Sequence, residues 1–117
     1  LVTMEELLTK QVDDVLIVYL SGRLDVHLSL EIEQAVNELI DKGHINLLFD
    51  LEKVVYLSSS GLRIFIAAMR KLKELNGQLK LANLTSSVKK IFKVVELIDL
   101  FDIYDSVDEA MASFKKQ

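Results

Sequence analysis

Continuous apolar runs alternate along this chain with segments in which apolar residues recur at helical spacing. The runs Val15–Leu20, Ile45–Leu51 and Gln78–Ala82 have the length and composition of buried strands. The segments that follow them concentrate apolar residues on one helical face. The first such face consists of Leu28, Ile32, Ala35, Val36, Leu39 and Ile40. This pattern predicts strands and helices in alternation.

Turn and capping residues mark where these elements begin and end. We expect an edge strand at Glu5–Val12 that turns at Asp13-Asp14 into the first buried strand, which Gly22 interrupts. Gly43 and Asn76-Gly77 stand where helix ends are expected. The remaining expected elements are a helix at Leu62–Leu75, a helix from Thr85-Ser86-Ser87 through Val94, a weak strand at Asp99–Tyr104 and a last helix from Ser106.

The resulting order is ββαβαβαβα, which predicts the α/β class. Helices that alternate with buried strands imply a mixed, mainly parallel sheet covered by about four helices. The first pair of strands is the expected antiparallel exception, at the N-terminal edge. We expect a single domain over residues 4–117, a length close to the commonest domain size.

Composition narrows the function classes. The net charge of −4 argues against a nucleic-acid partner, because binding phosphates requires clustered Lys and Arg. No apolar run reaches the roughly 18 residues of a membrane span, and no signal-peptide pattern opens the chain, so we expect no membrane association and a cytoplasmic location. The chain has no cysteine, hence no disulfide or thiol site. It also lacks the glycine-rich loops of nucleotide-binding proteins.

The spacing of the His and Asp residues does not favour a metal site or an acid–base catalytic site. His27 and His44 flank the first helix at opposite ends, too far apart to share a metal ion. The series Asp99, Asp102, Asp105 and Asp108 lacks the glycine and final glutamate of a calcium loop, and a solvated surface is the better interpretation. A phospho-aspartate receiver with Asp50 as acceptor lacks its acidic pair and its late lysine. We therefore expect Asp50 to be a structural carboxylate that accepts loop amides.

The segment Ser58-Ser59-Ser60-Gly61 carries the best candidate chemistry. Hydroxyls at the start of a helix can cap it, bind an anion or accept a phosphoryl group, and these three roles stay open at this point. Beyond the serines, Ile64 and Ala68 widen the apolar face of the helix. Such a face meets either a partner protein or a neighbouring helix of the same chain.

The segment Asp50–Leu62, with its strand, apolar pair and Ser-Ser-x-Gly-Leu ending, resembles the signature of STAS domains, the anti-sigma factor antagonist family. Gly22-Arg23-Leu24-Asp25 resembles the family's G-x-L-D element. Ala82-Asn83-Leu84 and Phe101–Ala110 resemble its later landmarks. The match covers nearly the whole chain from about residue 5, and the implied architecture is the STAS fold.

The resemblance implies a regulatory switch, not an enzyme, with no cofactor or metal of its own. The unphosphorylated form would bind an anti-sigma factor that is an ATP-dependent serine kinase and free its sigma factor. Phosphorylation would end this, and a PP2C-type phosphatase would reverse it. Aligned on Gly61, the acceptor is Ser59, with Ser58 as the alternative because it stands where many antagonists carry aspartate.

The residues implied at the partner surface are Asp25, Ser58, Ser60, Gly61, Arg63, Ile64 and Ala68. We expect the chain to be a monomer or a weak homodimer. The alternative function is a non-phosphorylated STAS scaffold or binding module, such as a partner of a lipid-transport ATPase.

Overall fold

The strands and helices follow one another in the predicted order. The computed structural model describes residues 7–114, so Glu5 and Glu6 of the expected edge strand, and residues 4–6 and 115–117 of the expected domain, lie outside the described residues. The elements are β1 (Leu8–Val12), β2 (Val15–Leu24), α1 (Val26–Asp41), β3 (Asn46–Leu57), α2 (Ser59–Glu74), β4 (Gln78–Ala82), α3 (Ser86–Val94), the 3-10 helix η2 (Ile98–Leu100), β5 (Asp102–Tyr104) and α4 (Val107–Phe114).

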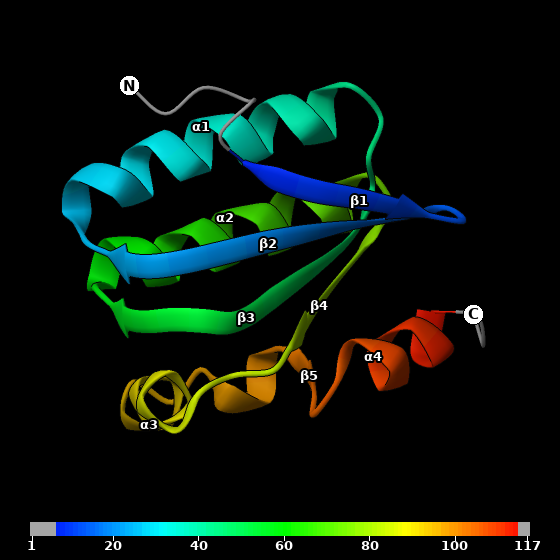
Figure 1. Cartoon of the computed structure of the whole chain (residues 1–117). Coiled ribbons are helices and arrows are strands. Elements are labelled where there is room, and N and C mark those ends of the chain that lie inside the picture. Colours follow the sequence, from blue (N-terminus) through cyan, green and yellow to red (C-terminus); the bar gives the residue numbers. More distant parts are fainter. Residues whose placement is uncertain (1–6, 115–117) are drawn as a thin grey trace.

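The strands form one sheet in the order β1-β2-β3-β4-β5 (Figure 1). Strand β1 pairs with β2 antiparallel, and the other neighbours pair in parallel. Asp13 takes a left-handed conformation, with φ of 54°, in the hairpin that joins the first two strands. Aspartate tolerates that conformation better than most residues. The mixed, mainly parallel sheet with an antiparallel N-terminal edge is thus confirmed.

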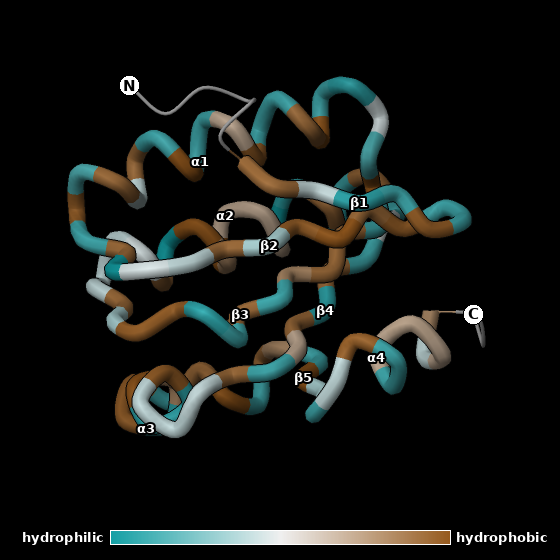
Figure 2. Tube along the Cα trace, viewed as in Figure 1, coloured by the Kyte–Doolittle hydropathy of each residue, from teal (hydrophilic) through white to brown (hydrophobic). Residues whose placement is uncertain are grey.

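The helices cover the two faces of the sheet unequally. Helices α1 and α2 pack against each other and against β2, β3 and β4, whereas α4 packs against β3, β4 and β5. The larger hydrophobic core contains residues of α1, α2 and α3, and the smaller one lies under α4 around Val15, Ile17 and Leu48. In Figure 2 brown stretches run along β2 and β3, and each helix alternates between brown and teal. This alternation is the pattern of a helix with one buried face.

Two strands extend further than the sequence pattern predicts. Strand β2 continues through Gly22 to Leu24, and β3 continues past Leu51 to Leu57. The extensions pair with each other in parallel, with register shifts on either side of Ser21 and Gly22. Gly22 has a φ of +83°, so it supplies an irregularity inside the strand where we expected an end. The pairing brings the ends of β2 and β3 together at Leu24 and Leu57.

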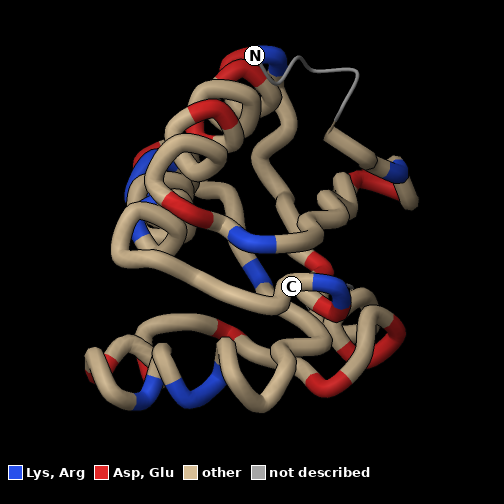
Figure 3. Tube along the Cα trace, turned by 60° about the vertical axis from the view of Figure 1, so that its left-hand side comes forward, with Lys and Arg blue, Asp and Glu red and all other residues tan. Residues whose placement is uncertain are grey.

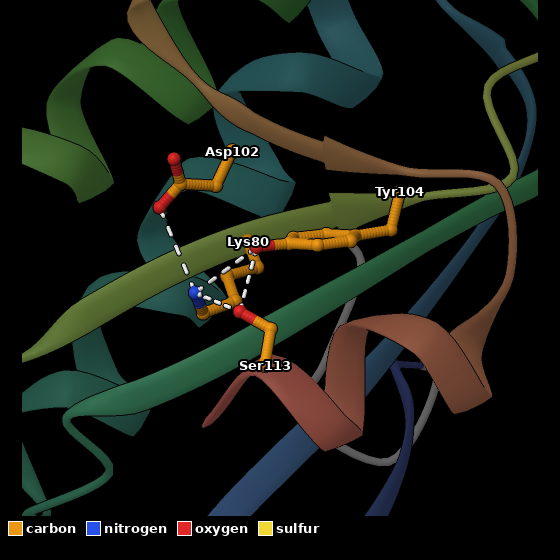
Figure 4. Close-up of polar contacts among 4 residues, drawn as sticks. All are labelled: Lys80, Asp102, Tyr104 and Ser113. Atoms are coloured by element: carbon orange, nitrogen blue, oxygen red, sulfur yellow. Dashed lines mark hydrogen bonds and ion pairs between the residues drawn. The ribbon is translucent and has the colours of Figure 1, made fainter. Parts of the chain in front are cut away.

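A buried lysine ties α4 to the sheet. The Lys80 side chain is 3% exposed, and its Nζ lies 2.6 Å from Ser113 Oγ, 3.5 Å from the Tyr104 hydroxyl and 3.7 Å from Asp102 Oδ2 (Figure 4). The two hydroxyls also bond each other at 2.6 Å. We call these four residues the Lys80 cluster. Each ammonium proton thus has an oxygen nearby, which is what a buried charge requires.

Candidate partner-binding site at the start of helix α2

Two helices begin side by side at the carboxyl end of the sheet. Leu24 at the end of β2 is the register partner of Leu57 at the end of β3. Each is followed at once by a residue that caps a helix: Asp25 caps α1 and Ser58 caps α2. Because β2 and β3 run parallel, the N-termini of α1 and α2 lie at the same edge of the sheet (Figure 1).

The Ser58 hydroxyl is fully used within the fold. Its Oγ accepts the Gly61 N–H at 3.1 Å and donates to the Leu24 carbonyl at 2.7 Å. The Ser58 N–H donates to the same carbonyl at 3.0 Å. A serine hydroxyl has only one proton to donate, and that proton is committed to Leu24. Ser58 is therefore both the cap of α2 and its attachment to β2.

The other two serines are differently placed. Ser59 is the first residue of α2 and is exposed, while Ser60 is half-buried. Within residues 7–114, neither the Ser59 nor the Ser60 hydroxyl makes a hydrogen bond. The helix begins at Ser59, slightly earlier than the expected start at Leu62. Ser59 therefore presents an unengaged hydroxyl at the positive end of a helix.

Gly61 completes the segment Ser58–Gly61, which we call the serine turn. A Cβ atom at this buried glycine would lie 2.5 Å from Leu57 Cδ1 and 3.2 Å from the Leu24 carbonyl oxygen. Its backbone conformation is ordinary for a helix, so close approach and not a special φ requires glycine here. Gly61 lets α2 pack directly against the ends of β2 and β3.

Asp25 lies at the same edge as the serine turn but makes its own contact. Its carboxylate accepts the Leu28 N–H at 2.9 Å, which is a helix cap, and the residue is exposed. Leu24, the residue before Asp25, is the one whose carbonyl holds Ser58. The structure thus brings Asp25 near the serine turn through the backbone of β2.

Opposite charges face each other on α1 and α2. The charged residues of α1 are all Asp or Glu, and those of α2 are all Lys or Arg except Glu74. This contrast is visible in Figure 3. Arg63 Nε lies 3.4 Å from Glu33 Oε1, and Lys71 Nζ lies 2.8 Å from Asp41 Oδ1. The Arg63 side chain is 56% exposed and that of Glu33 25% exposed. Arg63 therefore remains accessible beside the serine turn.

Ile64 and Ala68 do not belong to a free surface. Each is 1% exposed, and both lie in the larger core together with α1 residues such as Ile32 and Val36. The expectation that they contact a partner is therefore corrected. Their apolar face is covered by the neighbouring helix of the same chain, which was the alternative interpretation.

The remaining candidate residues have structural or solvent-facing positions. Asp50 Oδ1 accepts the Glu52 N–H at 3.1 Å and the Asn83 Nδ2 at 3.2 Å, as expected of a structural carboxylate. The acidic series Asp99, Asp102, Asp105 and Asp108 is exposed. Within residues 7–114, no group of three or more His, Asp or Glu side chains is placed to hold a metal ion. No helix in this part of the chain is both long and apolar enough to cross a bilayer.

Known proteins share both the sequence pattern and the fold. BtrV of Bordetella bronchiseptica, named as an anti-sigma factor antagonist, is 28% identical over 105 residues, which are 90% of each chain. The anti-sigma-B factor antagonist of Bacillus subtilis is 30% identical over 83 residues, which are 71% of this chain and 75% of the relative.

Solved structures show the same arrangement of helices and strands. An anti-sigma factor antagonist from Thermotoga maritima superposes with a TM-score of 0.89 at 22% identity, covering 94% of this chain and 95% of the other. The unphosphorylated form of the anti-sigma factor antagonist SpoIIAA superposes with a TM-score of 0.82 at 22% identity, covering 95% and 97%. The sequence profile of the STAS domain matches residues 6–110. The chain belongs to the STAS domain family.

Proposed function

We propose that this chain is an anti-sigma factor antagonist that is switched off by phosphorylation of Ser59. The names of its relatives support the antagonist role. SpoIIAA, whose fold the chain shares, has been solved in both an unphosphorylated and a phosphorylated form. The observation that carries the choice of acceptor is the contrast between Ser58, whose hydroxyl is engaged, and Ser59, whose hydroxyl is free and exposed.

In this proposal the partner is an anti-sigma factor with serine kinase activity, which supplies the ATP. Ser59 and Ser60 of the serine turn contribute the contact surface together with Asp25 and Arg63 beside it, while Ser58 and Gly61 hold the turn in shape. A phosphate on Ser59 adds about −1.5 to −2 charges at neutral pH. Charge of that size, placed within a contact surface, weakens binding to an acidic partner surface. A PP2C-type phosphatase restores the hydroxyl.

The proposal is tested by reconstituting the switch with the cognate anti-sigma factor and its sigma factor. We expect the unphosphorylated chain to displace the sigma factor, and ATP to reverse this as phosphate accumulates. The Ser59→Ala variant should displace sigma whether or not ATP is present, and Ser59→Asp should displace it poorly. Equal displacement by Ser59→Asp and the unmodified chain would contradict the electrostatic mechanism.

A matched control is available one residue away. Ser60 also belongs to the serine turn but lies at the second position of α2, and it is half-buried. Ser60→Ala removes a contact hydroxyl but leaves the acceptor, so ATP should still reverse the sigma displacement that this variant produces. Sigma displacement without any phosphate transfer in all variants would favour the alternative, a STAS binding module that works without phosphorylation.

A further inference from the structure

Arg63 is placed to respond to chemistry at Ser59. Ser59 is the first residue of α2 and Arg63 is the fifth, so they are four residues apart. Side chains with this spacing lie on the same helical face, with Cβ atoms about 5–6 Å apart. An anionic group four residues before a cationic one is also the favourable orientation of such a pair. The geometry therefore suits a contact between an anion on Ser59 and the Arg63 guanidinium.

The present contact of Arg63 holds it only loosely. Its Nε approaches one oxygen of Glu33 at 3.4 Å, which is beyond the usual range for a strong charge-assisted bond. The side chain remains 56% exposed. An exposed single contact of this kind contributes little to stability. Arg63 can therefore leave Glu33 at little cost in stability.

Other charged groups at this edge are less suitably placed. Arg23 lies over the ring of Tyr56, with its Cζ 4.4 Å from the ring centroid. Asp25 caps α1, and the exposed His27 lies in the first turn of that helix. Among the described residues, Arg63 is the basic side chain on α2 with the spacing that reaches Ser59.

We infer that Arg63 is the internal counter-cation for a phosphate on Ser59, and that phosphorylation moves Arg63 from Glu33 to the phosphate. This inference rests on the proposed function, because it takes Ser59 as the acceptor. The kinase transfers the γ-phosphoryl group of ATP to Ser59 Oγ, the hydroxyl proton passes to a base of the kinase, and ADP leaves. The guanidinium then meets phosphate oxygens that it can bind in a bidentate manner.

This exchange of ion-pair partners changes the surface charge of both α1 and α2. The phosphate on α2 is partly neutralised by Arg63, while Glu33 on α1 loses its cation. Lys71 of α2 and Asp41 of α1 join the same helices at 2.8 Å, and this pair is unaffected because Lys71 lies in the last turn of α2, far from Ser59. Phosphorylation would thus add negative charge at the start of α2 and uncover negative charge on α1, both next to the partner surface.

The test uses the full chain with phosphoserine incorporated at position 59 during synthesis, so that no kinase is needed. The second pKa of the phosphate is measured by ³¹P NMR titration at low ionic strength. Arg63→Gln should raise that pKa by about 0.15 to 0.4, the size expected for losing one helical ion pair. Arg70→Gln removes the same charge further along α2 and should change it by less than about 0.1.

Two additional measurements make the result decisive. The ¹⁵N resonance of Arg63 Nε should shift between the unmodified and phosphorylated chains, and Glu33→Gln should lower the phosphate pKa by removing the competing carboxylate. Arg23→Gln, which removes the cation over the Tyr56 ring, is measured as a second control. Equal changes of the phosphate pKa in Arg63→Gln and Arg70→Gln, or a change of this pKa only in Arg23→Gln, would overturn the inference. Failure of the kinase to modify Ser59 would refute the proposed function instead, and it leaves this titration readable.

Discussion

The serine turn and the Lys80 cluster both contain hydroxyl groups, but the two regions differ in how many of these hydroxyls are hydrogen-bonded within the fold. In the Lys80 cluster, the hydroxyls of Tyr104 and Ser113 bond each other and the buried ammonium group. In the serine turn, Ser58 is bonded at both its donor and its acceptor sites, whereas Ser59 is exposed and unengaged. Engagement of every polar atom indicates a structural role. A free and exposed hydroxyl at the start of a helix indicates a site for chemistry.

Substitutions of Lys80 should have the largest effect on stability. Lys80→Ala removes the buried stem and the charge together, and we expect a loss of about 2–4 kcal/mol in the free energy of unfolding. Lys80→Met keeps the volume of the stem while Tyr104 and Ser113 can still bond each other, so its loss should stay below about 1.5 kcal/mol. Urea unfolding measures both. Equal losses in the two variants would mean that the charge matters more than the packing.

The close approach at Gly61 is the next largest effect. Gly61→Ala places a methyl group against Leu57 and the Leu24 carbonyl, and we expect it to cost about 1–3 kcal/mol through overpacking. Ser60→Ala, at the preceding residue, serves as the control and should stay within about 0.5 kcal/mol. Unfolding curves of the two variants provide the measurement. An unchanged midpoint for Gly61→Ala would contradict the packing explanation.

Ser58 should show a smaller but clear structural effect. Ser58→Ala loses the helix cap and the bond to Leu24, and we expect it to lower the free energy of unfolding by about 1–2 kcal/mol. Ser58→Asp restores an acceptor for the cap but has no proton for the Leu24 carbonyl, so it should recover only part of the loss. Full recovery by Ser58→Asp would indicate that the bond to Leu24 contributes nothing.

Ser59 should have the smallest effect on stability. Its hydroxyl is exposed and unengaged, so Ser59→Ala should change the free energy of unfolding by no more than about 0.5 kcal/mol. The same substitution should remove phosphorylation completely. A loss above about 1 kcal/mol would show that Ser59 shares the capping role that the structure gives to Ser58.

Local patterns predicted most of the fold. The apolar runs and helical spacing gave the element order, because a buried face leaves its period in the sequence. The strand Gln78–Ala82 and the capping by Thr85 agree with the structure, since both depend on neighbouring residues. The extensions of β2 and β3 were missed because their pairing partners are about thirty residues away in the sequence.

The candidate site shows the same division between local and distant contacts. The position of the serine turn at a helix start followed from its residues, but the use of each hydroxyl depended on the Leu24 carbonyl from another strand. The burial of Ile64 and Ala68 depended on α1, which a helical pattern alone cannot distinguish from a partner protein. The Lys80 cluster left no signal, because its members are scattered from β4 to α4.

We propose that Ser58 shapes the serine turn and that Ser59 receives the phosphate. This proposal is tested most directly by incubating the unmodified chain, Ser58→Ala and Ser59→Ala with the cognate kinase and ATP, and then locating the phosphate by peptide mass spectrometry. We predict one phosphate on Ser59 in the unmodified chain and in Ser58→Ala, and none in Ser59→Ala. A phosphate on Ser58 in the unmodified chain would contradict it.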